Sequence, residues 1–175
     1  MINTVLKGDP KDSPVLDLER LRHSLRRVAS TVHVIAVKCR NGDFFATTAT
    51  AVVSVSFEPP TILVCLNKSG AIAQAILHED LFSIAVLTAS QQSLARACSG
   101  GLSHAEREVL FDPSDDFADA ALLRGAAANL ICRRIDSPSC GTHLTVFGEV
   151  IDASFRTQVD PLLYLDGRYG SFQAV

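Results

Sequence analysis

The dipeptide Asn41-Gly42 separates two strand-like runs, and it constrains the fold more than any other feature of the chain. Residues 31–38 and 44–56 are rich in Val, Ile, Thr and Phe, which strands favour. Asn-Gly between two such runs is a strong signal for a hairpin turn. We therefore expect an antiparallel pair, ended by Pro59 because proline cannot donate to a strand ladder.

Further strand-like segments follow along the chain. Apolar and β-branched residues predict strands over residues 61–66, 81–87 and 143–155, with one short extended piece in residues 160–172. Residues 126–135 are ambiguous between helix and strand, since their alanines favour a helix. A glycine in the long strand, Gly148, marks a bend or a bulge. Six or so antiparallel strands indicate a closed barrel, in which no strand edge stays exposed.

Three short helices complete the expected elements. Residues 17–29 have one apolar face at helical spacing, made of Leu18, Leu21, Leu25 and Val28. The other two helices cover residues 71–77 and 91–97, with Ser69 and Ser90 as candidate N-caps. Residues 98–119 are acidic and irregular, which predicts an excursion over the surface.

Composition and charge fit one globular domain. The chain has 175 residues, 47% of them hydrophobic, and no apolar run reaches the roughly 18 residues that span a bilayer. The first residues lack an apolar signal core, so we expect a cytoplasmic protein with a flexible arm over residues 1–16 and one domain over residues 17–175. A net charge of −3 without a long basic block argues against nucleic acid as a partner. Five scattered cysteines predict free thiols in a reducing compartment.

The most recognisable catalytic motifs are missing from the sequence. It has neither of the two familiar glycine loops that hold phosphate, no nucleophile elbow and no zinc-protease motif. Cys140 and His143 alone are too few ligands for a metal, so we expect none. This pattern favours cofactor chemistry, such as hydride transfer between two bound rings, in which the protein mainly binds and orients.

The stretch TTATAVVSVS, residues 47–56, combines small and hydroxylated side chains. In an unbroken strand Thr48, Thr50 and Val52 share one face, because successive side chains point to opposite sides. Small side chains let a flat ring approach the backbone closely, so the stretch is a candidate ligand site. The alternative is an ordinary barrel strand that binds nothing.

Two segments at neighbouring strand ends are candidates for holding a phosphate. Ser54 and Ser56 offer hydroxyls just before the proline break. Asn67, Lys68 and Ser69 offer an amide, a cation and a hydroxyl at a helix N-terminus, where an anion is favoured. The alternative for the second segment is an ordinary turn.

Three stretches of the chain resemble the short-chain flavin reductase family, the reductase components of two-component flavin-dependent monooxygenases of the 4-hydroxyphenylacetate and phenol hydroxylase type. They are TATAVVSVSFEPPTILVCLNKSGAIAQAI, GTHLTVFGEV and DPLLYLDGRY, in the family's order and spacing. The resemblance implies a mainly β fold, a six-stranded antiparallel FMN-binding split barrel that forms a homodimer. It also implies that NADH or NADPH reduces FMN or FAD, and that the reduced flavin diffuses to a partner monooxygenase. It favours a strand over residues 126–135.

The resemblance also assigns site residues by position. It implies that the isoalloxazine ring is lined by Thr48, Ala49, Thr50 and Ala51. It implies that the ribityl phosphate end is held by Ser54, Val55, Ser56, Asn67, Lys68 and Ser69. The flavin would also be bordered by Ala97, Cys98 and Ser99. His143, in Gly-Thr-His, would be the catalytic residue that positions the nicotinamide, and Arg168 and Tyr169 would approach the cofactor from the tail.

The sequence departs from the family pattern at two motifs and leaves alternatives open. Thr31 stands where the family often has glycine, and Thr142 stands where it has aspartate before the histidine. Phe111, in the acidic excursion, is a candidate lid over the site. A non-catalytic flavin-binding protein and an oxidase that retains FMN are alternative functions for the same barrel. The sequence selects neither between FMN and FAD nor between NADH and NADPH, and it does not identify the partner oxygenase.

Overall fold

The computed structural model describes residues 16–100, 102–158 and 160–174. The predicted flexible arm, residues 1–16, therefore lies outside the described residues except for Leu16. In the part of the chain that is described, no helix is long and apolar enough to cross a membrane.

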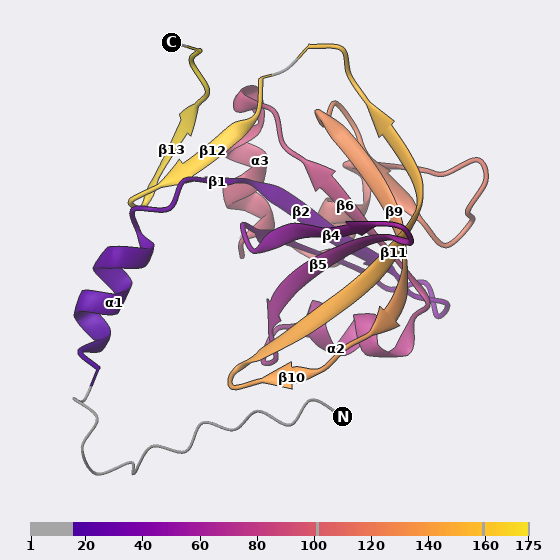
Figure 1. Cartoon of the computed structure of the whole chain (residues 1–175). Coiled ribbons are helices and arrows are strands. Elements are labelled where there is room, and N and C mark those ends of the chain that lie inside the picture. Colours follow the sequence, from indigo (N-terminus) through magenta and orange to yellow (C-terminus); the bar gives the residue numbers. More distant parts are fainter. Residues whose placement is uncertain (1–15, 101, 159, 175) are drawn as a thin grey trace.

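A closed antiparallel barrel forms the body of the molecule (Figure 1). Its sheet runs in the order β3 (Phe44–Ala49), β2 (His33–Lys38), β6 (Leu81–Val86), β9 (Ala128–Asp136), β11 (His143–Phe155), β5 (Pro60–Asn67) and β4 (Val52–Phe57). The two ends of this order, β3 and β4, follow each other directly in the chain. The β3–β4 segment therefore closes the barrel. If this segment is counted as one strand, the described barrel has six strands, the other five being β2, β6, β9, β11 and β5. The predicted mainly β antiparallel fold is confirmed.

The predicted return strand over residues 44–56 is wrong in one respect, because the chain breaks at Thr50 and Ala51. The first half, β3, pairs with β2, and the second half, β4, pairs with β5. The two halves therefore follow different partner strands, and the bend lies where the partner changes. The side-chain alternation predicted for Thr48, Thr50 and Val52 therefore does not run through the bend.

Local signals predicted two of the turns and bulges correctly. The hairpin at Asn41-Gly42 joins β2 to β3, with Gly42 at φ +92° and the Cys39 N–H donating to the Asp43 carbonyl at 2.8 Å. At Gly148 the pairing of β11 with β9 shifts register, as expected of a bulge. A Cβ at Gly148 would lie 2.5 Å from Cζ of Phe82, so the close approach of the ring requires glycine there.

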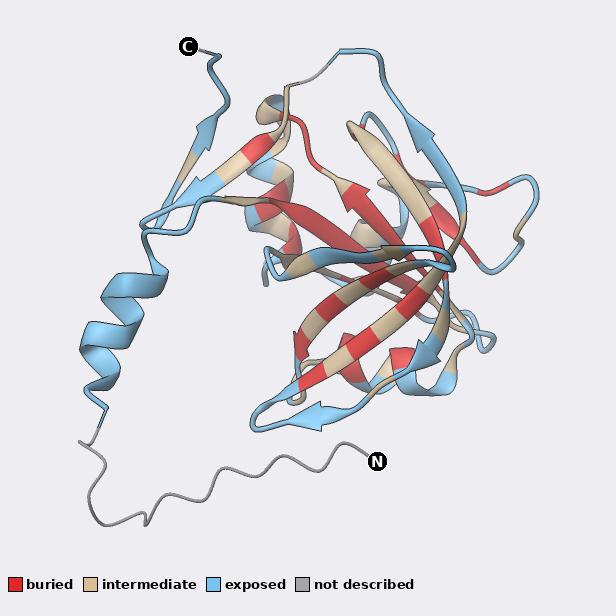
Figure 2. Cartoon of the chain, in the orientation of Figure 1, coloured by how far each residue is buried: buried red, intermediate tan, exposed pale blue. Residues whose placement is uncertain are grey.

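Two hydrophobic cores lie on the two faces of the barrel wall, and the strands between them are buried on both sides (Figure 2). The inner core fills the barrel and includes one face of α2 (Ala71–His78); its members include Ile35, Val64, Ile76, Ile84 and Val146. The outer core lies between β2, β3 and β6 and the elements that cover them; its members include Val34, Phe44, Ala85, Leu123 and Leu162.

The covering elements are short. They are η1 (Ala89–Gln91), α3 (Gln92–Cys98), α4 (His104–Glu108), β7 (Phe111–Pro113) and β8 (Ala121–Leu123). Phe111 is only 8% exposed and packs on Phe44, with the two ring centroids 4.9 Å apart. The prediction of Phe111 as a lid is therefore wrong, because its ring is part of the outer core.

Both predicted N-caps are wrong. Helix α2 begins after Gly70 and has no side-chain cap, because the Ser69 hydroxyl donates to Oδ1 of Asn67 instead. At the next helical segment Thr88 takes the cap position, and its backbone N–H donates to the Gln91 side chain at 3.0 Å. The ambiguous residues 126–135 contribute to strand β9, as the resemblance implied.

The tail forms a hairpin rather than one extended piece. Strands β12 (Leu162–Leu165) and β13 (Arg168–Ser171) pair around Asp166 and Gly167, whose φ values of +49° and +79° define a tight hairpin turn. Strand β1 (Ser30–Thr31) pairs with β12. Helix α1 (Leu18–Leu25) extends from this hairpin away from the barrel, and its apolar face is exposed (Figure 1).

Replacing Gly148 by alanine should destabilise the fold. The added Cβ meets the Phe82 ring in a filled core, so we expect a loss of about 1–3 kcal/mol in the free energy of unfolding. Gly170→Ala is the matched control, because a Cβ there meets no atom within 4 Å. Denaturant unfolding of both variants measures the difference, and equal midpoints would contradict this account of Gly148.

Candidate functional site

The candidate site is a cavity of about 320 Å³ where strands β3 and β5 part. The Cys65 N–H still donates to the Ala51 carbonyl at 3.0 Å, and beyond this bond β5 continues to Asn67 without a partner strand on its β3 side. The cavity lies in this split. It is lined by Thr47, Thr48, Ala49, Thr50, Ala51, Cys65, Leu66, Asn67, Gly70, Ile72 and His143.

The wall formed by β3 offers unpaired backbone groups to a ligand. Strand β3 pairs with β2 on one side only, and no strand in the described part of the chain pairs with its other side. Small side chains at Ala49 and Ala51 keep this edge open. Exposed backbone N–H and C=O groups need partners, so they suit the polar edge of a flat ring.

The N-terminus of α2 lies at the opposite wall. Gly70 and Ile72 line the cavity, and the first turn of the helix has no side-chain cap. The first N–H groups of a helix lack intrahelical partners and carry a partial positive charge, so they favour an anion or a polar edge. The failure of the predicted Ser69 cap therefore leaves these donors available.

His143 enters the cavity from a neighbouring strand. Its partner in the β11–β5 pairing is Asn67, so antiparallel register brings the two predicted residues together. The ring Nδ1 lies 2.9 Å from the Thr142 hydroxyl. This contact orients the imidazole and leaves Nε2 without a hydrogen bond among the described residues, so Nε2 is the atom that can meet a ligand.

The Asn67–Ser69 segment reaches the site only in part. Oδ1 of Asn67 accepts from the Ser69 N–H at 3.0 Å and from the Ser69 hydroxyl at 2.9 Å. The Lys68 N–H donates to the Thr142 carbonyl at 3.0 Å, which ties this turn to the segment before His143. Asn67 lines the cavity, whereas Lys68 and Ser69 lie at its margin and are not part of the lining.

Ser54, Val55 and Ser56 do not line the cavity. They lie on β4, past the break, and Val55 is largely exposed. The Ser56 hydroxyl donates to the Glu58 carbonyl at 3.1 Å and accepts from the Glu58 N–H at 3.0 Å. Its hydrogen-bonding capacity is thus used within the turn after β4, and a role in phosphate binding remains a prediction.

Helix α3 lies behind β3 rather than in the cavity. The Thr48 hydroxyl donates to the Ala95 carbonyl at 2.7 Å, and the Ser99 hydroxyl donates to the same carbonyl at 2.8 Å. Cys98 is buried in the outer core, and burial raises the pKa of its thiol. Ala97, Cys98 and Ser99 therefore do not line the cavity; the Ser99 hydroxyl shares the Ala95 carbonyl with Thr48.

Arg168 and Tyr169 line a different cavity, of about 520 Å³, along the tail hairpin. The Tyr169 ring contacts the Tyr164 ring at a centroid distance of 5.2 Å, and the Arg96 guanidinium lies 5.5 Å from its centroid. Tyr169 thus connects the hairpin to α3. In the single chain these two residues are separate from the cavity that contains His143.

One buried titratable group lies next to the site. His33 pairs with Ala49 across β2 and β3, and burial lowers the pKa of His33 although the nearby backbone of Ala49 and Thr31 opposes the shift. The imidazole is therefore neutral at pH 7, and it adds no charge behind the wall of the cavity.

Sequence reasoning missed five lining residues: Thr47, Cys65, Leu66, Gly70 and Ile72. Cys65 and Leu66 directly precede Asn67 on β5. A prediction that β5 separates from β3 would have placed both residues in the cavity between these strands. The missing signal was the bend at Thr50, because neither a glycine nor a proline marks it.

An antiparallel barrel with a cleft at the split between two strands defines the class of split-barrel proteins. The comparisons with known proteins identify the family within this class. Residues 25–173 match the flavin reductase like domain family, and the chain belongs to it. The resemblance on the three sequence motifs is thereby confirmed.

Named relatives and a solved structure agree with this family. The chain is 36% identical to the reductase component of the FADH(2)-dependent resorcinol hydroxylase of Rhizobium sp. over 86% of this chain and 85% of that protein. It is 32% identical to the FMN reductase (NADH) RutF of Variovorax paradoxus, covering 92% and 89% of the two chains. The NADH:FAD oxidoreductase SgcE6 of Streptomyces globisporus, in complex with NAD and FAD fragments, superposes with a TM-score of 0.81 at 26% identity, covering 97% and 98%.

Replacing Ala51 by leucine should weaken flavin binding. Ala51 is exposed and lines the cavity, so the added bulk crowds a bound ring without filling the core. We expect the dissociation constant for FMN to rise about 5- to 150-fold, the equivalent of about 1–3 kcal/mol of overpacking. Fluorescence titration of FMN measures it, with Ala153→Leu on the exposed end of β11 as the control. An unchanged dissociation constant would show that Ala51 is part of the barrel wall and does not border the bound flavin.

Proposed function

We propose that this protein is an NADH-dependent flavin reductase that reduces FMN or FAD and supplies the free reduced flavin to a flavin-dependent monooxygenase. The observation that carries the proposal is the split cavity, in which the free edge of β3, Asn67 and His143 surround one space. The relatives named as an NADH-dependent FMN reductase and as a hydroxylase reductase component support it.

The residues of the cavity fit a flavin ring. A bound flavin supplies the hydride acceptor of the reaction. The edge of β3 from Thr47 to Ala49 offers donors and acceptors to the polar side of the ring, and Ala51 leaves it room. The uncapped first turn of α2 and the Asn67 amide lie across from this edge and favour the electron-rich or phosphate end.

We propose that His143 positions the nicotinamide of NADH against the flavin. The Thr142 hydroxyl fixes one ring nitrogen, and Nε2 remains to contact the donor. Hydride transfer depends on the distance and orientation of two rings rather than on a proton shuttle, so a positioning contact is the chemistry that this side chain can supply.

An open site fits a flavin that leaves after reduction. The cavity lies at the surface where the sheet splits, and Phe111, the one lid candidate from the sequence, is packed in the outer core. This arrangement favours release of the reduced flavin to a partner over an oxidase that keeps FMN.

We further propose a homodimer in the cytoplasm. Strand β4 presents Val53, Val55 and Phe57 to solvent, and Phe57 is 92% exposed. Apolar side chains gathered along one strand suit an isologous contact with a second copy. Sedimentation of the protein measures its mass in solution, and a monomer at working concentration would contradict the dimer.

NADH oxidation should depend on added flavin. We expect loss of NADH absorbance when FMN or FAD is present and none without flavin, because the flavin is a substrate that must be supplied. A side-by-side assay with FMN, FAD and no flavin measures this. Absence of turnover with both flavins would refute the proposed activity and leave a non-catalytic flavin-binding protein.

His143→Ala should weaken the use of NADH while flavin binding stays unchanged. The lost contact is one hydrogen bond of about 0.5–1.5 kcal/mol, which is a rise of about 2- to 13-fold in the KM for NADH. His143→Gln retains an amide donor and should restore part of the loss. Equal kinetics for the parent and the alanine variant would contradict the proposed contact between His143 and NADH.

A further inference from the structure

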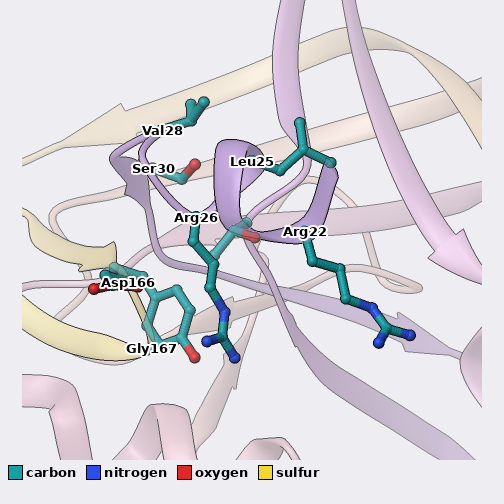
Figure 3. A pocket seen from close by; sticks show the side chains of 9 residues that line it. Arg22, Leu25, Arg26, Val28, Ser30, Asp166 and Gly167 are labelled. Atoms are coloured by element: carbon teal, nitrogen blue, oxygen red, sulfur yellow. The ribbon is translucent and has the colours of Figure 1, made fainter. Parts of the chain in front are cut away.

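A second cavity, of about 300 Å³, lies between helix α1 and the tail hairpin (Figure 3). Its lining includes Arg22 and Arg26 from the helix and Gly167 from the turn of the hairpin. The helix is fixed to the hairpin by the Asp166 N–H, which donates to the Arg26 carbonyl at 3.1 Å, and by an ion pair of Arg27 with Asp166 at 3.3 Å. The helix and the hairpin are thus held together by two contacts at Asp166.

The charge of this cavity favours an anion. Arg22 and Arg26 are four residues apart, so their side chains lie on one side of α1, as Figure 3 shows. Among the described residues no carboxylate pairs with Arg26, and Arg22 pairs only with Glu19 of its own helix. Asp166, the one carboxylate of the described lining, is already paired with Arg27.

The remaining walls suit a planar apolar group. Leu25 and Val28 contribute aliphatic side chains, and Tyr164 contributes an aromatic ring that makes an edge-to-face contact with Tyr169. Arginine pairs bind phosphate oxygens in a fork geometry, and an aromatic ring stacks on a base. Together these walls match a phosphate group joined to a purine.

This cavity adjoins the flavin cavity through one residue. Thr50, at the bend between β3 and β4, lines both. A dinucleotide whose reactive ring lies in the split cavity would extend its other half past Thr50. We infer that the cavity between α1 and the hairpin binds the adenosine diphosphate half of a dinucleotide substrate, with Arg22 and Arg26 on the pyrophosphate. This inference rests on the proposed flavin reductase function.

The affinity must come from the two guanidinium groups. The cavity borders the last turn of α1, where carbonyl oxygens carry partial negative charge and disfavour an anion. Removal of the arginines therefore leaves no cationic side chain in the described lining of this cavity. The two side chains are exposed and act on no core contact, so their removal tests binding rather than folding.

The experiment titrates ADP into the protein by calorimetry and compares Arg22→Ala/Arg26→Ala with the parent. We expect the dissociation constant for ADP to rise roughly ten- to a hundredfold, the effect of losing charge-assisted hydrogen bonds. Arg20→Ala is the matched control, because Arg20 lies on the same helix outside the lining. An equal loss in the control, or no loss in the double variant, would overturn the assignment.

Steady-state kinetics of the same variants identify the dinucleotide. A rise in the KM for FAD, with the KM for FMN unchanged, assigns the cavity to the flavin. A rise in the KM for NADH, with FMN as acceptor, assigns it to the nicotinamide dinucleotide. If neither constant moves, the inference is refuted while the activity of the parent with FMN still stands. If the parent shows no NADH oxidation with FMN, the proposed function fails, and the ADP titration still decides whether the cavity binds its ligand.

Discussion

One hydrogen bond marks the point on which the architecture depends, the bond from the Cys65 N–H to the Ala51 carbonyl at 3.0 Å. On one side of it the chain pairs with β2, and on the other side it pairs with β5. The bend at Thr50 therefore closes the barrel and, at the same place, prevents β3 from pairing with β5. A barrel whose strand stayed straight would lack either the closure or the cleft.

Much of the fold follows from local signals in the sequence. Asn41-Gly42 and Gly148 act through backbone geometry, which a single residue determines, so the hairpin and the bulge were predictable. The tail hairpin carried the same kind of signal in Asp166-Gly167, but the sequence analysis predicts only one short extended piece in residues 160–172. The burial of Phe111 depends on a contact with Phe44, which is distant in the chain, so local patterns did not reveal it. The cap at Thr88 was a local signal that was missed, because Thr88 and Gln91 form a capping box.

The predicted site residues also divide into those that meet in the cavity and those that do not. Thr48 to Ala51, Asn67 and His143 meet in one cavity because antiparallel register joins segments that the motifs had already marked. Ser54 to Ser56 and Arg168 do not line this cavity, because the bend at Thr50 and the fold of the tail place them on other surfaces. Residues that are neighbours in the sequence thus come to lie on different surfaces where the chain changes from one partner strand to another.

The free edge of β3 has a consequence for the protein without its ligand. An unpaired strand edge is a template on which another chain can add a strand, and proteins usually protect such edges with charges, proline or a covering segment. From Thr47 to Thr50 the described edge carries no charged residue and no proline. A ligand bound along these backbone groups would therefore also shield the edge from pairing with another chain.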